Sequence, residues 1–579
     1  MTGGKVLVFG DDTRSFLAIV RSLGRRGIIV HAAPANFRSP ALRSRYIHAI
    51  HDLPPWMSEG GEWLATLTRL LQQERYDLVI PCNETMLLPL QRHRHTLSAL
   101  ARLAIPDNRA IAVLFDKHET RRLAQQMGVR VAAGRLLRAD DTSEGIVEEF
   151  GSPIVVKPRR SYSLGSLAAR GKVHVLNEKT QLASLLHGVD PSETLIEQYF
   201  GGQGVGVSVL ASRGRVLQAF EHHRVREIAG ASFYRYSAPL TPDLAAACEA
   251  IVAALDYTGI AMFEFKMNAA GAWILLEVNA RPWGSMPLPV ALGVDFPHRW
   301  YRLMVAGEET PAVGYRTGVY GRNLVPDLQI SLIEAAASRR GRAATAWFLI
   351  CRGAELLRAF SGRDVHDVLV SDDPRPGLVE LQEIAQNLWR RVVANWLPGA
   401  TSRRRQRARV QVRALGRNAA RPLIMFVCQG NICRSPFAAA LLRARLADGR
   451  ISIGSAGMMP QPGRPTPKFG LEAAAAHGID LRAHRSLWLT RQLAEAASLL
   501  VVFDDITRCA VLDRYPETKL RVVLLGDLAR LGEIPDPIDG DAARFRQVYS
   551  QITMAIAELA PLLAPRRRAG GLLSLVGQR

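Results

Sequence analysis

A cysteine and an arginine six positions apart, Cys428 and Arg434, have the types and spacing needed to hold and attack a phosphate. The apolar run 423–427 predicts a strand before them, and Pro436 with the Ala/Leu-rich run after it predicts a helix behind them. The loop 428–434 would then lie at a helix amino end, where backbone N–H groups and the helix dipole favour an anion. Such a field holds a cysteine as the nucleophilic thiolate, and a guanidinium matches two oxygens of a phosphate. The alternative is a buried structural cysteine with an unrelated surface arginine, which fits this order of elements poorly.

Two glutamates and an asparagine form a second candidate site. Residues 259–282 read as two apolar strands joined by a tight turn, so we predict a hairpin. The simplest register places Glu264 opposite Leu275 and diagonal to Glu277, with Asn279 on the same face. Carboxylates on a half-buried face are costly unless a cation pairs them, and such oxygen ligands, together with phosphates, suit Mg²⁺. The alternative is a polar-faced hairpin that is open to solvent.

Alternating strands and helices precede this hairpin and would position it. The stretch 10–14, after the first predicted strand, lacks the glycine fingerprint of a dinucleotide site. We therefore expect residues 1–110 to form a Rossmann-like layer that does not bind NAD. Its strands are expected at 5–10, 28–33 and 76–81, and a helix at 15–27.

Candidate nucleotide-binding residues lie between this layer and the hairpin. Asp116 reads as the N-cap of a helix that ends at Gly128, with Lys117 in its first turn. Lys157 lies at the polar end of a predicted strand, before a loop at 159–166 whose Ser/Gly content suits closure over phosphates. Each lysine alone is a weak signal.

Two further stretches complete this region. A strand at 194–200 leads into a glycine-rich turn at 201–206. The segment 221–227, rich in His and Arg, lies in a predicted hairpin and either binds an acidic substrate or forms a solvated edge strand.

Taken in this order, the two lysines and the hairpin make residues 1–325 resemble the ATP-grasp superfamily, in its carboxylate–amine ligase and carbamoyl-phosphate-synthase-like branch. The resemblance implies that Lys117 and Lys157 contact the ATP phosphates and that Arg281 contacts an acyl phosphate or its carboxylate. It implies that adenine lies at a hinge and that one or two Mg²⁺ ions bind the hairpin. The hinge residues would be Glu197, Gln198, Tyr199 and Phe200, and the metal ligands Glu264, Glu277 and Asn279. The implied reaction turns ATP and a carboxylate into an acyl phosphate, which an amine or another nucleophile captures.

The segment Cys428-Gln-Gly-Asn-Ile-Cys-Arg-Ser-Pro436 resembles the signature of the low-molecular-weight protein tyrosine phosphatases, and the resemblance runs over about residues 421–565. The stretches 455–457, 477–485 and 534–537 follow in the family's order. The resemblance implies Cys428 as nucleophile, Arg434 as transition-state clamp and Asp536 as general acid, in a phosphocysteine mechanism without metal. The implied phosphate-loop and supporting residues are Gln429, Gly430, Asn431, Ile432, Cys433, Ser435, Ser455 and His484.

Positions where this family often carries aromatic walls for a phenyl ring read Ile538-Asp539 and 458–462, without aromatic residues. The substrate is therefore either a phosphotyrosine protein or a small phosphate ester. A second reading is an arsenate reductase, which uses the same loop. Separately, Cys433 is placed to form a disulfide with Cys428 as a redox guard. The late, closely spaced cysteine pair that such reductases need is absent from the sequence.

Composition and charge indicate the cellular compartment and the kind of partner to expect. Six cysteines without a tight framework and an apolar stretch at 5–10 too short for a signal peptide lead us to expect a cytoplasmic protein without a membrane span. The net charge is +21, and residues 403–421 hold eight arginines and no acid. We interpret this run as a solvated linker, with an acidic partner as the alternative and no specific nucleic-acid motif.

We therefore expect a multidomain α/β fusion enzyme that joins a carboxylate to an amine and hydrolyses a phosphate ester. The expected parts are a Rossmann-like pre-ATP-grasp domain, an α+β ATP-grasp domain, a helical connector with the Arg-rich linker, a flavodoxin-like three-layer α/β phosphatase domain and a disordered tail. Their boundaries are expected at 1–110, 111–325, 326–420, 421–565 and 566–579. The alternative is a protein tyrosine phosphatase regulated by a nucleotide-sensing ATP-grasp module.

Overall fold

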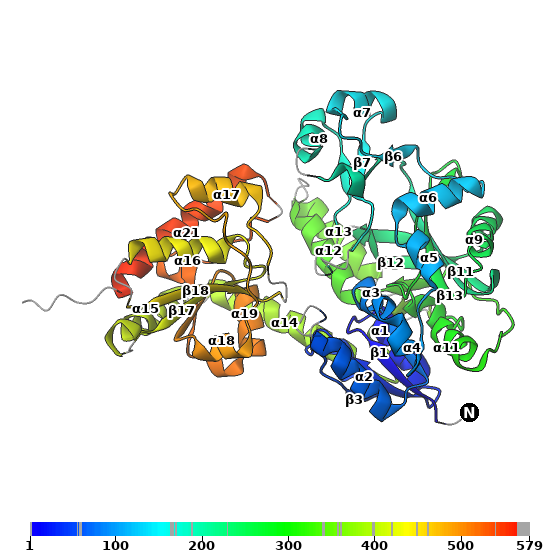
Figure 1. The fold of residues 1–579 in the computed structure, drawn as a ribbon, viewed down its shortest axis with the longest axis horizontal. Helices are drawn as coiled ribbons and strands as arrows, with labels where there is room; N and C mark the ends of the chain where they lie inside the picture. Colours follow the sequence, from blue (N-terminus) through cyan, green and yellow to red (C-terminus); the bar gives the residue numbers. More distant parts are fainter. Residues whose placement is uncertain are drawn as a thin grey trace, which may run out of the picture. The chain divides into compact units, whose positions relative to one another are not determined.

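The computed structural model divides the chain into two compact units, Met1–Gln386 and Asn387–Arg579 (Figure 1). We call them the N-terminal unit and the C-terminal unit. The structure describes all residues except 1–2, 55, 57–60, 163–166, 168–170, 187–188, 229, 338–341, 356–357, 359–361, 397–399, 419–420, 447–449, 460–462, 539 and 564–579. The tail predicted at 566–579 lies outside the described residues.

The N-terminal unit begins with a five-stranded parallel sheet, which confirms the predicted Rossmann-like layer. Alternate residues of its central strand face opposite layers: Val6 and Val8 pack toward helix α1 (Ser15–Gly24), whereas Leu7 and Phe9 pack toward α2 (Glu62–Glu74). The strand order is β3-β2-β1-β4-β5, so the chain changes direction across the sheet between β1 and β4. In open parallel sheets, the crevice beyond the carboxyl ends of two such strands is the usual ligand site. The strands are β1 (Lys5–Phe9), β2 (Ile29–Ala33), β3 (Ile47–Ile50), β4 (Leu78–Pro81) and β5 (Arg102–Leu103).

A small antiparallel sheet forms a second layer in this unit. Its order is β6-β9-β7-β8, and an apolar cluster joins it to two helices. The strands are β6 (Gly134–Leu136), β7 (Ile154–Pro158), β8 (His174–Leu176) and β9 (Thr194–Gln198), and the helices are α7 (Ser143–Phe150) and α8 (Lys179–Leu186).

A seven-stranded sheet forms the rest of the N-terminal unit, in the order β14-β13-β10-β11-β12-β15-β16. One face packs against α5 (Asn108–Leu114), α6 (Lys117–Gln126) and α9 (Pro242–Ala254), and the other joins the core beneath β1 and α1. The predicted hairpin is therefore covered on both sides. The strands are β10 (Gln203–Ser212), β11 (Arg215–Ile228), β12 (Ala231–Ala238), β13 (Gly259–Met267), β14 (Trp273–Asn279), β15 (Tyr320–Arg322) and β16 (Asp364–His366).

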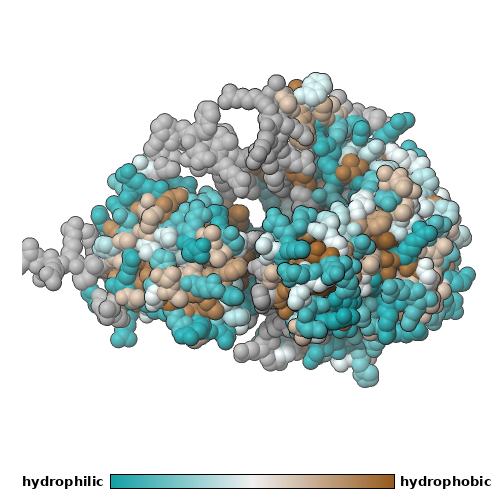
Figure 2. Space-filling view, turned by 90° about the horizontal axis from the view of Figure 1, so that it is seen from above, coloured by the Kyte–Doolittle hydropathy of each residue, from teal (hydrophilic) through white to brown (hydrophobic). Residues whose placement is uncertain are grey.

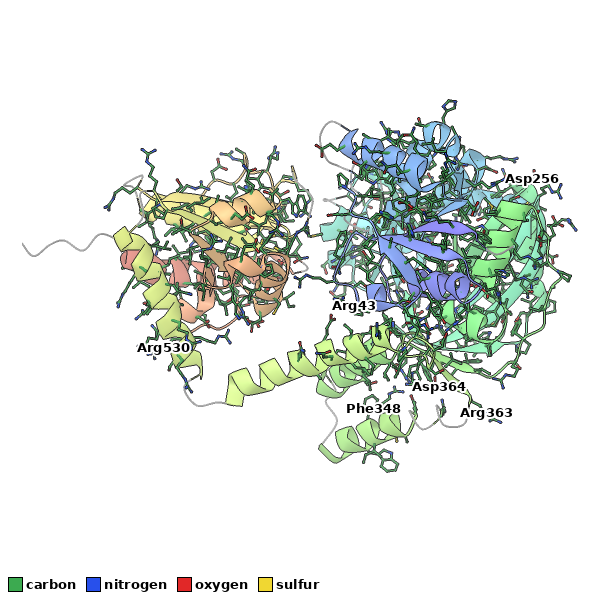
Figure 3. The ribbon with its side chains drawn as sticks, turned by 90° about the horizontal axis from the view of Figure 1, so that it is seen from below. Arg43, Asp256, Phe348, Arg363, Asp364 and Arg530 are labelled. Carbon is green, nitrogen blue, oxygen red and sulfur yellow. The ribbon has the colours of Figure 1, made fainter. Side chains whose placement is uncertain are left out.

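The last strand of this sheet comes from the region predicted as a helical connector. Strand β16 pairs in parallel with β15, and Asp364, labelled in Figure 3, accepts hydrogen bonds from Arg322 at 3.0 and 3.1 Å. The sheet thus continues past residue 325. The helices expected in this region are present as α12 (Leu324–Ala337), α13 (Arg342–Glu355) and α14 (Arg375–Trp396).

The C-terminal unit is the predicted three-layer α/β fold. Four parallel strands lie in the order β18-β17-β19-β20, and Ile424 and Phe426 face one layer of helices while Met425 and Val427 face the other. Figure 1 shows α16, α17 and α21 on one side of the sheet and α18 and α19 on the other. The strands are β17 (Leu423–Cys428), β18 (Ser452–Gly457), β19 (Leu499–Val502) and β20 (Val522–Leu524). The helices are α15 (Ala400–Asn418), α16 (Arg434–Arg445), α17 (Lys468–Ala475), α18 (Arg491–Ala496), α19 (Asp505–Arg514), α20 (Leu525–Leu528) and α21 (Ala542–Leu563).

The Arg-rich run is not the solvated linker that the sequence predicted. It forms helix α15, whose Ala408 and Val412 are buried in the core of the C-terminal unit. Arg404 lies 3.4 Å from Asp527, and Arg409 pairs with Glu558 on α21. Apolar residues four positions apart make one face of a helix, and the density of arginine around them masked that pattern.

Hydrophilic residues cover much of the visible surface of each unit, with hydrophobic residues in small scattered patches (Figure 2). None of the described helices combines the length and the apolar character that a membrane span requires.

Candidate active sites

Cys428 is the last residue of β17, and the loop after it runs directly into α16 at Arg434. Strand β17 lies between β18 and β19, so this loop occupies the switch point of the sheet. The buried Cys428 Sγ accepts a hydrogen bond from the Asn431 N–H at 3.2 Å and lies 3.1 Å from Ser435 Oγ. The sulfur thus has a backbone N–H donor on one side and a serine hydroxyl within hydrogen-bond distance on the other.

Asn431 holds the loop in shape. Its φ is +54°, in the left-handed region that asparagine tolerates better than most residues. Its Nδ2 donates to Ser435 Oγ and Ser455 Oγ, both at 2.9 Å, and its Oδ1 accepts from the Leu487 N–H at 2.7 Å. His484 Nε2 lies 2.7 Å from its carbonyl oxygen, as a donor would. Burial lowers the pKa of His484, although this hydrogen bond opposes the shift. Four side chains that the sequence singled out therefore form one network.

Arg434 is fixed beneath the loop by two carboxylates. Its Nη1 donates to Asp504 at 2.5 Å and to the Ile534 carbonyl at 3.0 Å, and its Nη2 donates to Asp536 at 2.5 Å. Burial alone would lower the pKa of Arg434, but Cys428, Asp536 and Asp504 outweigh it and raise the pKa. Nε is buried and has no hydrogen-bond partner among the described residues. A buried donor without a partner is costly, so this nitrogen is the group that a bound phosphate oxygen would satisfy.

The remaining loop residues shape the rim. Gln429 is exposed and Ile432 is partly buried, while the Gly430 carbonyl accepts a hydrogen bond from Arg464 at 2.7 Å. Burial, Asp536 and Cys428 raise the pKa of the Cys433 thiol far above its usual range. Both Cys428 and Cys433 are free. A thiol held protonated is a poor partner for thiol–disulfide exchange, which weighs against a redox-guard disulfide between Cys433 and Cys428.

The hairpin of the N-terminal unit has a different register from the one predicted. Phe265 pairs with Leu275, but Glu264 pairs directly with Glu277 because a β-bulge adds one residue to β14 between these pairs. Glu264 is therefore opposite Glu277 rather than diagonal to it. A bulge re-aims the side chains beyond it, and here it brings two carboxylates face to face.

Three oxygen-bearing side chains converge at this point. Asn279 Nδ2 lies 2.9 Å from Glu264 Oε1 and 3.4 Å from Glu277 Oε1, and Arg224 lies 2.7 Å from the other oxygen of Glu264. Burial raises the pKa of Glu264, Arg224 lowers it, and Glu277 raises it. We call Glu264, Glu277 and Asn279 the carboxylate cluster.

The carboxylate cluster fits a divalent cation of the Mg²⁺ type. Glu264 and Glu277 repel each other across one amide nitrogen, and a cation between their oxygens would remove that repulsion. Mg²⁺ prefers such oxygen ligands and commonly completes its shell with phosphates and water. Among the described residues, no group of three or more His, Cys, Asp or Glu side chains could hold a metal ion. With two carboxylates and one amide, the cluster would leave coordination positions for phosphate and water.

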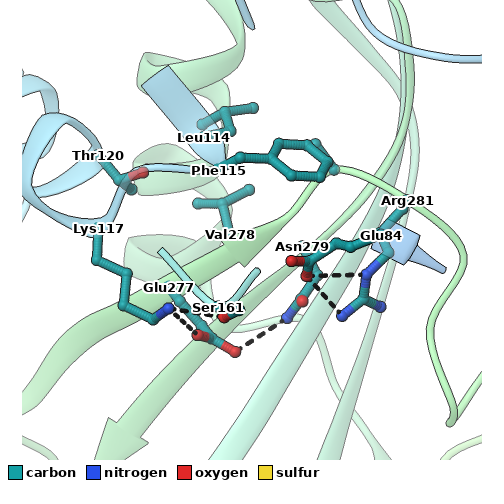
Figure 4. A pocket seen from close by; sticks show the side chains of 11 residues that line it. Glu84, Leu114, Phe115, Lys117, Thr120, Ser161, Glu277, Val278, Asn279 and Arg281 are labelled. Carbon is teal, nitrogen blue, oxygen red and sulfur yellow. Dashed lines mark hydrogen bonds and ion pairs between the residues drawn. The ribbon is translucent and has the colours of Figure 1, made fainter. Parts of the chain in front are cut away.

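A small polar pocket adjoins the carboxylate cluster (Figure 4). Lys117 enters it from the start of α6, where its Nζ lies 2.8 Å from Ser161 Oγ and 3.9 Å from Glu277. Asp116 caps this helix, as predicted, by accepting from the N–H groups of residues 118 and 119. Arg281 lines the other side of the pocket and is held by Glu84 at 3.1 Å. The structure thus gathers Lys117, Glu277, Asn279 and Arg281 around one space.

Lys157 and the predicted adenine hinge are not among the residues that line this pocket. Lys157 Nζ pairs with Glu197 at 2.7 Å, and Arg121 lies 3.4 Å from the same carboxylate; all three side chains are buried. Gln198 and Tyr199 are exposed, and Phe200 is partly buried. Their contact with nucleotide stays a prediction.

The glycine-rich stretch 201–206 is only partly a turn, because β10 begins at Gln203. A Cβ at Gly204 would lie 2.7 Å from the Arg224 side chain, and one at Gly206 would lie 2.2 Å from the His222 ring. Glycine at these two positions leaves space for side chains of β11, and it is not needed there to bend the chain. Strand β11 lies inside the seven-stranded sheet, so the reading of 221–227 as a solvated edge strand is wrong.

Sequence reasoning missed several side chains that complete the two sites. Asp504 caps α19 and binds Arg434, Glu84 follows β4 and binds Arg281, and Arg224 reaches Glu264. Asp504 and Glu84 share a detectable signal: each is an acid just beyond the carboxyl end of a parallel strand, where ligand-site residues gather. Arg224 lies in the stretch 221–227 that the sequence singled out, but its contact with Glu264 follows only from the register of β10 with β11 and β13.

Residues 423–568 match the family model of the low molecular weight phosphotyrosine protein phosphatases. The probable low molecular weight protein-tyrosine-phosphatase EpsP of Ralstonia nicotianae is 35% identical over 138 residues, which is 24% of this chain and 93% of EpsP. Residues 423–568 belong to this phosphatase family. The low molecular weight protein-tyrosine-phosphatase Etp of Escherichia coli K12 is 33% identical to the phosphatase domain over 141 residues, which is 24% of this chain and 94% of Etp.

Residues 190–320 match a family model described as ATP-grasp in the biosynthetic pathway with Ter operon. The N-terminal unit therefore contains an ATP-grasp domain, and the chain is a fusion of two enzyme domains. One similar solved structure is the biotin carboxylase domain of Hydrogenobacter thermophilus 2-oxoglutarate carboxylase with MgADP and bicarbonate. It is 17% identical, covers 55% of this chain and 73% of its own, and has a TM-score of 0.44.

Proposed function

We propose that the chain is a bifunctional enzyme: a cysteine-dependent phosphomonoester phosphatase fused to an ATP-dependent ligase that joins a carboxylate to an amine. The observation that carries the phosphatase half is the buried Arg434, whose two Nη groups are tied to Asp504 and Asp536 while its Nε remains available. We further propose that residues 1–110 and 111–325 supply the ligase and residues 421–565 the phosphatase chemistry.

In the phosphatase reaction, the Cys428 thiolate attacks phosphorus and the bond from phosphorus to the leaving oxygen breaks. Asp536 gives its proton to that oxygen as it leaves. Water then attacks the phosphocysteine, Asp536 takes a proton from it, and the bond from phosphorus to sulfur breaks to restore the thiolate. Arg434 and the loop N–H groups bind the equatorial oxygens in both steps, where negative charge is concentrated.

The substrate of the phosphatase half is a phosphotyrosine protein or a small phosphate ester. Ile538, which follows the Asp536-Pro537 pair, is 43% exposed and offers an aliphatic rather than an aromatic wall. Parallel assays with p-nitrophenyl phosphate and a phosphotyrosine peptide separate the two classes, with Cys428→Ser as the control. Comparable turnover of both would support a protein phosphatase, and turnover of the small ester alone would support a small phosphorylated metabolite.

In the ligase reaction, a substrate carboxylate attacks the terminal phosphorus of ATP, ADP leaves, and an amine displaces phosphate from the acyl phosphate. When bound, Mg²⁺ would supply charge neutralisation on the transferred phosphoryl group, held by Glu264, Glu277 and Asn279. Lys117 is placed to pair with phosphate oxygens beside Glu277, and Arg281 to orient the carboxylate at the far side of the pocket.

Hydroxylamine offers a direct test of the ligase half, because it captures acyl phosphates as hydroxamates. The full chain is incubated with ATP, Mg²⁺, hydroxylamine and a panel of carboxylic acids, and hydroxamate and ADP are measured. Equal amounts of both products with at least one acid support the proposal. ADP formation that no acid stimulates, or none at all, would contradict it.

A further inference from the structure

An arginine beyond the first strand of the N-terminal unit, Arg14, has no role in the ligase function proposed above. Arg14 follows β1 and precedes α1, beyond the carboxyl ends of β1 and β4, where the strand order of the first sheet reverses. Glu84, which follows β4, holds Arg281 at the rim of the pocket. Arg14 therefore belongs to the same sheet edge as a residue that lines the proposed carboxylate site.

The Arg14 guanidinium is held in place without being paired. A Cβ on Gly284 would lie 2.7 Å from its Nη1 and 2.8 Å from its Cζ, so the group rests against the backbone of Gly284. Its Cζ lies 5.5 Å from the centre of the Phe233 ring. Among the described residues, its guanidinium forms no hydrogen bond and no ion pair; its backbone N–H donates to Asp12.

Neighbouring acids are already engaged. The Asp12 carboxylate accepts from the N–H of Arg14, from Ser15 Oγ at 2.8 Å and from the Phe16 N–H at 3.2 Å. Asp367 forms two hydrogen bonds with Arg235, at 2.6 and 2.9 Å. The carboxylates of Asp12 and Asp367 thus accept hydrogen bonds from donors other than the Arg14 guanidinium.

The electrostatic balance around Arg14 favours an anion. Burial lowers the pKa of Arg14, Asp12 and Asp367 oppose that shift, and Arg235 and Arg281 add to it. A partly desolvated cation next to two other guanidinium groups is costly unless a negative group joins it. Arg235 and Arg281 each have a carboxylate partner, whereas Arg14 does not.

We propose that Arg14 binds a second anionic group of the ligase substrate, a carboxylate or phosphate carried in addition to the carboxylate that is activated. The proposal rests on the ligase function proposed above and narrows its substrate class to acids with two negative groups. Arg281 would orient the carboxylate that reacts, and Arg14 would hold the other end of the molecule. Gly284 has no side chain because one would displace the Arg14 guanidinium.

The competing explanation is structural, since an arginine stacked on Phe233 against a backbone stabilises the packing of β12 on the first sheet. The two explanations differ in what a conservative change does. A structural cation–π role predicts equal effects on every substrate, whereas an anion-binding role predicts a loss confined to acids with a second charge.

The test compares matched acids in the hydroxylamine assay with the full chain. Pentanoate carries one carboxylate, glutarate a second carboxylate and 4-phosphonobutanoate a phosphonate on a chain of similar length. For the preferred two-charge acid, Arg14→Gln should raise KM about ten- to a hundredfold, while KM for ATP and for pentanoate stay within about twofold. Arg14→Lys should lie between, and the matched control Arg26→Gln, beyond the other end of α1, should behave like the unmodified chain. Equal changes with all three acids, or none, would overturn the proposal.

A binding measurement keeps this result separate from the ligase proposal. If the unmodified chain forms no hydroxamate with any acid, the ligase function fails, and the anion site is judged from thermal shifts with glutarate and 4-phosphonobutanoate. We expect one of these acids to raise the melting temperature of the unmodified chain and of Arg26→Gln, but not that of Arg14→Gln. The same rise in Arg14→Gln, or no rise in the unmodified chain, would overturn it.

Discussion

The phosphatase loop and the carboxylate cluster differ in how the chain builds them. The loop is local: Cys428, Asn431, Arg434 and Ser435 lie within eight consecutive residues, and hydrogen bonds join three of them directly. The carboxylate cluster is assembled from separate strands, and Arg224 and Lys117 take up part of its negative charge. A site made of backbone N–H groups at a helix start is preformed, whereas one made of long side chains depends on register and packing.

The largest effect should come from the nucleophile. We expect Cys428→Ser to lower the turnover of p-nitrophenyl phosphate by about 10⁴-fold or more, because an unactivated hydroxyl does not replace a thiolate. Cys433→Ser is the matched control, since that thiol is held protonated and should contribute less than tenfold. Retained turnover in Cys428→Ser would remove the cysteine from the mechanism.

In the carboxylate cluster, Glu277→Gln should lower hydroxamate formation by about 10²-fold or more. The change removes one negative charge from the proposed Mg²⁺ ligands, and Mg²⁺ would neutralise the phosphoryl group during transfer. The half-saturating Mg²⁺ concentration should rise in the same variant. Glu309→Gln, which alters a surface carboxylate paired with Arg215, serves as the control. Indistinguishable Mg²⁺ dependence in the two variants would argue against the carboxylate cluster as the metal site.

The role of Asp536 as general acid can be tested by comparing esters with different leaving groups. Asp536→Asn should slow phenyl phosphate hydrolysis by about 10²- to 10⁴-fold, because phenol needs a proton to leave. Nitrophenolate leaves without one, so the same variant should slow p-nitrophenyl phosphate by about tenfold or less. Steady-state rates on both esters decide the matter, and equal slowing would place the general acid elsewhere.

Helix α15 offers a matched pair for stability. Val412 is 0% exposed and Val410 is 60% exposed on the same helix. Val412→Ala should lower the free energy of unfolding of the C-terminal unit by about 1–3 kcal/mol, through lost burial and a cavity. Val410→Ala should change it by about 0.5 kcal/mol or less. Chemical denaturation of both variants measures the difference. Equal values would indicate that the Arg-rich stretch is a solvated linker rather than part of the core.

The smallest effect concerns pH in the N-terminal unit. Burial, Asp367 and Glu383 raise the pKa of Glu380 to about 7. The folded state therefore binds this proton more tightly than the unfolded state, and stability from it is present at low pH and is lost as pH rises through about 7. Glu380→Gln should raise the melting temperature at pH 8 relative to the unmodified chain and lose this advantage below about pH 4.5. A difference that does not vary with pH would contradict the assignment.

Local patterns predicted local structure well and missed what depends on pairing across the sheet. The strand, loop and helix order around Cys428, the cap at Asp116 and the hairpin at 259–282 all follow from neighbouring residues, and the structure has them. The bulge that sets Glu264 opposite Glu277 has no glycine or proline to mark it. The pairing of β16 with β15 and the burial of Val412 depend on residues far away in the sequence.

The most direct test of two separate active sites is to measure both activities in Cys428→Ser and in Glu277→Gln, always in the full chain. We predict that each variant abolishes one activity and leaves the other within about twofold of the unmodified chain. Loss of p-nitrophenyl phosphate turnover in Glu277→Gln, or a dependence of that turnover on ATP, would contradict it. Either result would favour a phosphatase that nucleotide binding controls.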